Sequence, residues 1–387
     1  MTYARARLYL GITGVGFWVV ASVLALLAGL PTTLFPNYDL DATETAGRLL
    51  TIIAGYIVLS LPFDLFGGYI LPRRFNRSAP SSLPAYLVSW LRGVLVQGVV
   101  YFLAGMLFIT AARQSGSVFL VIVLAGMIML LQLIMQEWLA RLAGGFALSK
   151  PELSGAEKLI KRWGLDLPDN VVAYAGKDEG FVGALAGLPG MERLVLPAAW
   201  LTALNDEALA AQITRRIGVI KRGSRERGVY LALIWNLAGL WIASSLAGPN
   251  AVDTSSGLLT TILYFNLWSF VGLLVLPSLS RGGVFEADIF ARKAGVPHDV
   301  FNVLLPELDR RQDDEPARSR LIETIFHPIP SVSRRLERLH EKHAHAFGWW
   351  HGARMALFLS WGCMGFLARA VHCNSGRPEL WVMLPGD

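Results

Sequence analysis

The chain has 387 residues, of which 53% are hydrophobic and 17% charged, with 35 Lys and Arg against 29 Asp and Glu. Soluble proteins average about 25% charged residues, so this composition excludes an ordinary soluble enzyme, and the abundance of apolar residues excludes a disordered chain. The two cysteines, Cys363 and Cys373, are too few for a disulfide framework or a four-thiolate metal site.

Six apolar segments reach the roughly 20 residues that a helix needs to cross a bilayer. Their only charged residue is Asp64, and in chain order they are residues 8–30, 49–68, 93–112, 117–135, 229–247 and 257–278. A shorter seventh candidate, residues 355–368, lies between Arg354 and Arg369. The sequence therefore predicts six or seven spans. The first is expected to be an uncleaved anchor, because it exceeds the length of a signal-peptide core.

The distribution of Lys and Arg predicts the orientation of these spans. The N-terminus, the loop after the second span and the hydrophilic segments 136–228 and 280–352 are rich in basic residues, whereas the loops 31–48 and 248–256 are acidic or nearly uncharged. Positively charged loops stay in the cytoplasm. We therefore expect a multi-pass protein of the cytoplasmic membrane, with its N-terminus and both hydrophilic segments in the cytosol. The tail from His372 would lie outside if the seventh span exists.

These assignments give a mainly α, polytopic helical membrane protein with a cytosolic α+β part that a transmembrane hairpin interrupts. Its expected regions are 1–135 with four spans, 136–228, the hairpin 229–279, 280–352, and 353–387 with the possible seventh span and tail. Helical spacing predicts helices over 153–163, 205–220, 285–294 and 332–345, the first behind a capping box at 149–152. Short runs bounded by turn residues predict strands at 171–174 and 194–196.

Several short motifs of the hydrophilic segments occur in a characteristic order. They are residues 181–183 before the strand 194–196, residues 204–211 at the start of a helix, Ser280 and Arg281 with Glu286 and Asp288 after the hairpin, and His327 and Pro328 followed by Arg334 and Arg335. In this order the chain resembles the HtpX-like and CAAX-prenyl-endopeptidase family of membrane zinc metallopeptidases over about residues 140–340. The resemblance implies a zincin-like domain whose two parts flank the hairpin.

The resemblance also implies a zinc site, and here the sequence departs from the family pattern. The family has His-Glu-x-x-His before the hairpin and a Glu ligand after it. At those positions this chain has Arg215, Arg216, Val219 and Val284. Arginine has no lone pair to donate, and two guanidinium groups repel a dication. We therefore expect a degenerate member without zinc, another cofactor or catalytic residues.

Four residues would still surround the former metal position, namely Asp288, His327, Arg334 and Arg335. The helices before and after the hairpin are expected to pack together, with Asp288 forming an ion pair to Arg215, Arg216 or one of the 334–335 pair. Such a pseudoenzyme would bind or regulate a membrane-protein or peptide partner in the old cleft, by strand addition at its edge. Anionic lipids are expected to bind the basic residues before the fifth span, Lys221, Arg222, Arg225 and Arg227, and no nucleic acid is expected.

Two alternative functions remain open at this point. An active zinc metalloendopeptidase would require unrecognised ligands to converge from His327, from Glu286 or Asp288, and from His340, His343 and His345. A transport or lipid-handling protein with a regulatory cytosolic domain would use a water-lined path through Asp64, Asn236 and Asn266. For Asp64 we expect an interfacial ion pair with Arg73 or Arg74 instead.

Overall fold

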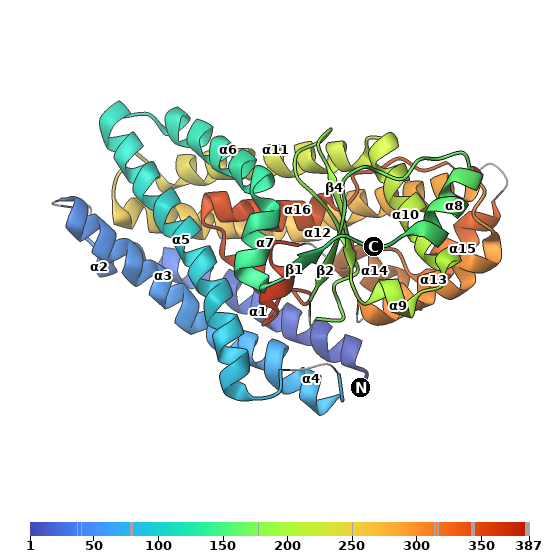
Figure 1. Ribbon diagram of the computed structural model, residues 1–387. Helices are drawn as coiled ribbons and strands as arrows, with labels where there is room; N and C mark the ends of the chain where they lie inside the picture. The colour runs from blue at the N-terminus through green and yellow to red at the C-terminus, as the bar shows by residue number, and fades with distance from the viewer. Residues whose placement is uncertain are drawn as a thin grey trace.

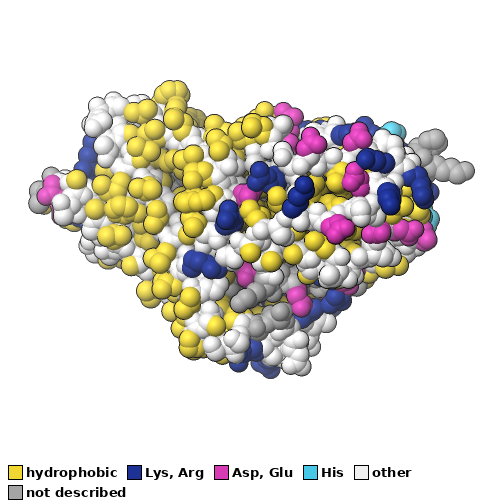
Figure 2. Space-filling model, viewed as in Figure 1, with side chains coloured by type: hydrophobic (Ala, Val, Ile, Leu, Met, Phe, Trp, Pro, Cys, Tyr) yellow, Lys and Arg dark blue, Asp and Glu magenta, His cyan; other side chains and the backbone are white. Residues whose placement is uncertain are grey.

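The structure is a computed structural model that describes residues 1–36, 38–39, 41–77, 80–176, 178–249, 251–312, 315, 317–341 and 345–383. A bundle of long helices occupies one end of the molecule, shorter helices occupy the other, and a small sheet lies between them (Figure 1). Hydrophobic side chains gather over the long helices, whereas charged side chains gather over the short ones (Figure 2). The division into spans and a hydrophilic part is therefore visible on this face of the molecule.

All six expected spans are helical. They are α1 (Tyr3–Leu27), α3 (Ala42–Leu65), α5 (Leu83–Ser115), α6 (Val118–Ile134), α11 (Ser224–Ala247) and α12 (Ser255–Ala294). Among the described residues five helices are long and apolar enough to cross a membrane, and a sixth is if α6 and α7 (Gln136–Gly144), bent by 72°, form one broken span. The short α2 (Leu30–Leu34) follows α1, and α3 continues through a π-turn, η1 (Phe66–Ile70), into α4 (Leu71–Arg74).

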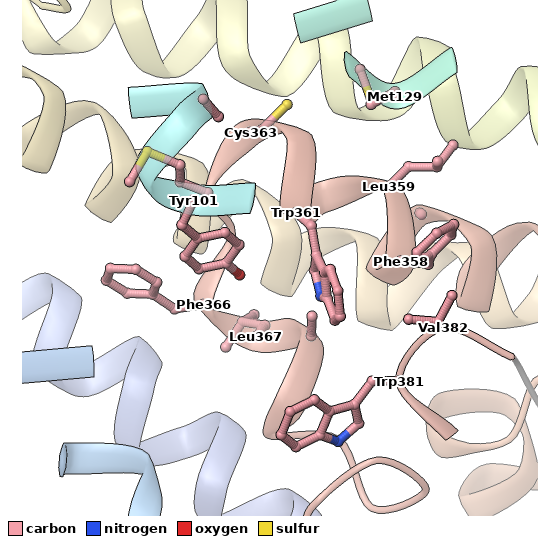
Figure 3. Packing of buried hydrophobic residues seen from close by; sticks show 14 of the residues in the cluster. Tyr101, Met129, Phe358, Leu359, Trp361, Cys363, Phe366, Leu367, Trp381 and Val382 are labelled. Carbon is pink, nitrogen blue, oxygen red and sulfur yellow. The ribbon is translucent and has the colours of Figure 1, made fainter. Parts of the chain in front are cut away.

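The expected seventh span does not form one helix. This region contains α16 (Gly352–Leu359) and the 3-10 turns η2 (Ser360–Cys363), η3 (Phe366–Arg369) and η4 (Pro378–Leu380). Eight helical residues extend about 12 Å, far less than a bilayer core of about 30 Å. The helical turns of residues 352–363 end at Met364, whose φ is 58°. The segment lies inside the bundle, where Trp361 and Phe366 pack near Tyr101 (Figure 3).

This inner C-terminal segment is fastened to the second span by a buried ion pair. Arg369 binds Asp64, and each side chain is 1% exposed. Asp64 also accepts hydrogen bonds from Trp90 Nε1 and from the backbone N–H of Gly376, both at 2.9 Å. The partner of Asp64 is therefore not Arg73 or Arg74, as the sequence led us to expect. The true partner is 305 residues away in the chain, beyond the reach of any local pattern.

A four-stranded sheet lies in the hydrophilic part. Its strands are β1 (Ala147–Ser149), β2 (Val171–Ala175), β3 (Ala184–Ala186) and β4 (Arg193–Pro197), in the order β1-β2-β4-β3 with only β2 and β4 parallel. The two expected strands are β2 and β4. The expected capping box is wrong, because Ser149 pairs with Ala173 in the sheet and α8 (Ser154–Arg162) begins after Leu153 without a side-chain cap.

In the described parts of the chain, six further helices belong to the hydrophilic part, and all but α14 (Arg320–Phe326) contribute to a second apolar core. The six are α8, α9 (Trp200–Ala203), α10 (Asp206–Lys221), α13 (His298–Arg311), α14 and α15 (Val332–His340). α10 begins where expected, with Asn205 accepting the N–H of Ala208 at 2.9 Å. The helix expected over 285–294 is the end of α12, which runs unbroken out of the membrane span. α15 ends at His340, earlier than expected, and His343 lies outside the described residues.

The tail returns to the sheet and is held there by a second ion pair. Arg377 Nε donates to Asp178 Oδ2 at 2.6 Å, and the N–H of Gly180 donates to Asp178 Oδ1 at 2.9 Å. Burial raises the pKa of Asp178, but the charge and hydrogen bonds of Arg377 outweigh it and hold this pKa below its ordinary value. The carboxylate therefore stabilises the fold above its unfolded-state pKa and loses that contribution as the pH falls through its folded-state pKa.

We expect Asp178→Asn to destabilise the protein at neutral pH by about 1.5–3 kcal/mol, the usual net value of a hydrogen bond to a charged group. Because the wild-type carboxylate protonates in acid, the gap between the two melting temperatures should be constant near neutral pH and should narrow as the pH falls below the ordinary pKa of an aspartate, about 4. Thermal unfolding in detergent at several pH values measures it. A gap that does not narrow in acid would contradict this role for the Asp178–Arg377 pair.

Candidate functional site

The helices on either side of the hairpin, α10 and α12, pack directly against each other. Gly218 of α10 faces Phe290 of α12, and a Cβ at Gly218 would lie 2.5 Å from the Phe290 ring. Only glycine allows this approach without a shift. The close contact brings Arg215, one turn before Gly218, to Asp288 on α12. The expected packing of the two helices is therefore present.

Asp288 is the centre of a buried charge cluster. Arg215 Nε donates to Asp288 Oδ1 at 2.6 Å, while Nη1 of the same side chain donates to Gln212 Oε1 at 2.5 Å. Arg335 of α15 donates to both carboxylate oxygens, each at 2.8 Å. The side chains of Arg215, Asp288 and Arg335 are 0%, 1% and 2% exposed. The ion pair expected for Asp288 is therefore present, and it involves two arginines.

The other positions that the resemblance assigned to the metal site are filled by apolar or cationic groups. Val219 and Val284 are buried in the same apolar core. Arg216 is 1% exposed, and its Nη2 donates to the carbonyl oxygen of Val182 at 3.3 Å. Its guanidinium lies over the Trp350 ring, 5.1 Å from the centroid. These four positions therefore hold two guanidinium groups and two aliphatic side chains.

These residues do not fit a zinc ion. A guanidinium and an isopropyl group offer no lone pair, and both carboxylate oxygens of Asp288 already accept hydrogen bonds from arginine. Within the described parts of the chain, no group of three or more His, Cys, Asp or Glu side chains is placed to hold a metal ion. No chemical step through a metal can be derived from this arrangement.

A stretch of chain that the sequence did not single out covers this centre. Residues 347–353 cross the hairpin, where the backbone N–H groups of Trp349 and Trp350 donate to the carbonyl oxygens of Leu279 and Ser224 at 3.2 and 3.0 Å. Gly348 lies so close to Gly283 that a Cβ at Gly348 would be 2.0 Å from the Gly283 nitrogen. Trp350 thereby closes the space over Arg216. In the sequence, this crossing is indicated only by Gly348 and by the consecutive tryptophans Trp349 and Trp350.

The strand edge proposed for peptide capture is covered as well. All three residues of β3 are buried. The backbone groups that flank β3 have side-chain partners, because Val182 O accepts from Arg216, Gly187 O accepts from Arg225 at 2.5 Å, and Gly187 N–H donates to Gln136 at 3.3 Å. A peptide can add to this edge only by displacing these side chains.

Those residues of an unrecognised zinc site that the structure describes do not form a metal-binding group. Glu286 pairs with Arg227 at 2.7 Å, and Asp288 is held by its two arginines. The His340 ring lies 4.1 Å from that of His298, and the His327 ring lies 5.6 Å from that of His372. Arg334 Nη1 forms an ion pair with Glu323 Oε1 at 2.5 Å. Of the retained candidates, only Asp288 and Arg335 are brought together.

The four basic residues expected to contact lipid divide into two pairs. Lys221 and Arg222 are exposed. Arg225 is 1% exposed against the sheet, and Arg227 is bound to Glu286 and to the carbonyl oxygen of Gly348. The structure therefore differs from the expectation for Arg225 and Arg227, because the start of α11 turns their side chains inward.

The polar residues of the spans fasten helices to one another. Asn236 Nδ2 donates to the carbonyl oxygen of Ala356 in α16 at 3.0 Å, and Asn266 Nδ2 donates to Ser22 Oγ of α1 at 2.8 Å. Asp64 holds η3 through Arg369. Each residue thus bonds to a different neighbouring element, a packing role that does not require a transport path.

The fold, unlike the sequence, is similar to that of a known protein. The sequence matches no protein-family description and no curated protein. Among solved structures, the crystal structure of Ste24p from S. mikatae is similar, with a TM-score of 0.63 and 15% identity over 75% of this chain and 73% of that chain. At this identity the likeness is one of fold alone. The chain therefore has the apolar helices of a multi-pass membrane protein and a fold like that of Ste24p.

Proposed function

We propose that this chain is a non-catalytic protein of the metallopeptidase fold, which binds a protein or peptide partner on its cytosolic side and does not cut it. The observation that carries the proposal is the Arg215–Asp288–Arg335 cluster at the meeting of α10 and α12. A metallopeptidase needs an electrophilic metal and a general base at this place. Here the charges are already paired within the protein.

Access to the centre supports the same proposal. Hydrolysis requires a water molecule and a substrate carbonyl to reach the reacting groups, yet Arg215, Arg216, Val219 and Val284 are each no more than 1% exposed. Trp350 closes the centre from one side and β3 is buried on another. A partner that binds in the former cleft therefore has to displace contacts that residues 347–353 make with the rest of the protein. Lys221 and Arg222 remain available for anionic lipid at the membrane surface.

The test combines zinc analysis with reconstruction of the ligands. Tag-free wild-type protein in detergent should contain well under one zinc per chain and should not cleave unfolded polypeptides. The variant Arg215→His/Arg216→Glu/Val219→His/Val284→Glu restores the full ligand set on the same helices. We expect it to bind about one zinc per chain, since a tetrahedral site uses three protein ligands and a water.

The matched control is the same variant with Val219 retained, which lacks one ligand and should bind zinc far more weakly. Stoichiometric zinc in the wild type that survives mild chelation would overturn the non-catalytic proposal. If the folded four-residue variant bound no more zinc than its control, α10 and α12 would not carry the former ligand positions. The position-by-position assignment would then fail.

A further inference from the structure

A groove of about 360 Å³ opens between α1 and α12. Its walls are almost entirely apolar and include Ile12, Leu274 and Phe326. Ile12 is 40% exposed and Leu274 is 44% exposed, so the mouth opens between two spans, on a surface that faces lipid. A volume of this size lies within the range of small-molecule pockets, about 300–1,000 Å³.

The groove lies where the spans meet the hydrophilic part. Its floor includes Pro277 of α12 and Phe326 of α14. One turn after Pro277, Arg281 donates to the carbonyl oxygens of Glu323 and His327 at 2.8 and 3.0 Å, which fixes α14 against α12 at this level. One end of the groove therefore lies between two apolar helices, and the other lies beside the hydrophilic part.

Arg354 of α16 lines this groove without an anionic partner. Its side chain is only 6% exposed, and its Nε and Nη1 atoms are buried with no hydrogen-bond acceptor among the described residues. None of the residues lining the groove is acidic. Arg215, Arg335 and Arg369, in contrast, are all bound to carboxylates. A buried cation without a counter-charge is costly, so the arrangement calls for an anion from outside the chain.

We propose that Arg354 and this groove bind one anionic phospholipid, independently of any role of the former peptidase centre. The phosphodiester pairs with the Arg354 guanidinium, whose planar donors match phosphate oxygens. One acyl chain lies along Ile12 and Leu274 in the groove. The bilayer supplies such lipids at the depth where the groove begins. This site is separate from the exposed Lys221 and Arg222.

Native mass spectrometry of full-length protein released from micelles containing phosphatidylglycerol tests the proposal. Wild-type protein should retain one phosphatidylglycerol per chain and should not retain phosphatidylcholine at the same concentration. Arg354→Gln should weaken retention about tenfold, the effect of removing one charge-assisted contact. Arg354→Lys, which keeps the charge, should recover part of it. The matched charge control is Arg74→Gln at the exposed end of α4.

A second pair of variants tests the groove without touching the arginine. Gly16 lines the groove, and a Cβ there has no neighbour within 4 Å, so Gly16→Leu places an apolar side chain in the groove with room for its Cβ. Gly55 of α3 has an equally open Cβ position away from the groove, which makes Gly55→Leu the control. Only Gly16→Leu should reduce lipid retention. Equal retention by wild type, Arg354→Gln and Gly16→Leu would overturn the site. Retention of added oleate in place of phosphatidylglycerol would overturn the phospholipid as its ligand.

Discussion

Asp288→Ala is expected to destabilise the protein by about 3–5 kcal/mol, the usual cost of removing one member of a buried ion pair. The loss belongs at the upper end of this range, because the carboxylate serves both Arg215 and Arg335, and both arginines are almost fully buried. Without it, two guanidinium groups face each other across an apolar core. The melting temperature, followed by tryptophan fluorescence in detergent, measures the loss.

The control and a rescue variant separate charge from packing. Asp166 lies exposed after α8, so Asp166→Asn should change the melting temperature little. Replacing all three members by apolar residues, as in Arg215→Met/Asp288→Leu/Arg335→Met, should restore much of the stability, because a buried ion triad can be exchanged for well-packed apolar groups. An Asp288→Ala protein as stable as the wild type would show that the cluster contributes nothing to the fold.

Asp64→Ala should release the inner C-terminal segment from the second span. Asp64 binds Arg369 and accepts hydrogen bonds from Trp90 and Gly376, so its loss leaves a buried cation and two buried donors without their acceptor. We expect a destabilisation of about 3–5 kcal/mol. This loss falls in the same range as that of Asp288→Ala but occurs within the membrane bundle.

Cysteine labelling measures the release locally. Cys363 in η2 is 2% exposed, so in a Cys373→Ser background it should react slowly with a maleimide in the wild type and much faster in Asp64→Ala. Arg74→Gln, which removes an exposed arginine near the same span, should leave the rate unchanged. If labelling stayed slow in a folded Asp64→Ala protein, apolar packing alone would hold the segment, and the ion pair would not be needed.

The hydrophilic part and the membrane part each contain a buried cluster of arginine and aspartate. In the hydrophilic part, arginine and aspartate occupy the centre where the resemblance places metal ligands. In the membrane part, arginine and aspartate hold a segment that replaces a seventh span. Arg354 has no such carboxylate, and the phospholipid proposal rests on that difference.

The sequence by itself determined the features that depend on local periodicity and composition. Runs of apolar residues predicted the helices of the spans, five of them in the described chain and a sixth if α6 and α7 form one span. A helix that satisfies its own backbone is the stable form of an apolar chain in lipid. The alternation of short apolar runs and turn residues fixed β2 and β4. The order of motifs around the hairpin indicated the fold that Ste24p shares. Packing the two helices together predicted an ion pair for Asp288, but left its partner open among Arg215, Arg216 and the 334–335 pair.

Only the tertiary structure decided where long-range partners meet. Residues 355–368 have the composition of a span, but the chain breaks at Met364 and the segment folds into the bundle. Its position depends on Asp64 and Arg369, which the sequence separates by 305 residues. The burial of Arg225 against the sheet and the closure by Trp350 likewise depend on contacts between distant elements. So does the burial of Arg354 Nε and Nη1, which have no hydrogen-bond partner among the described residues. Such contacts are set by how faces pack in three dimensions, and no local pattern encodes them.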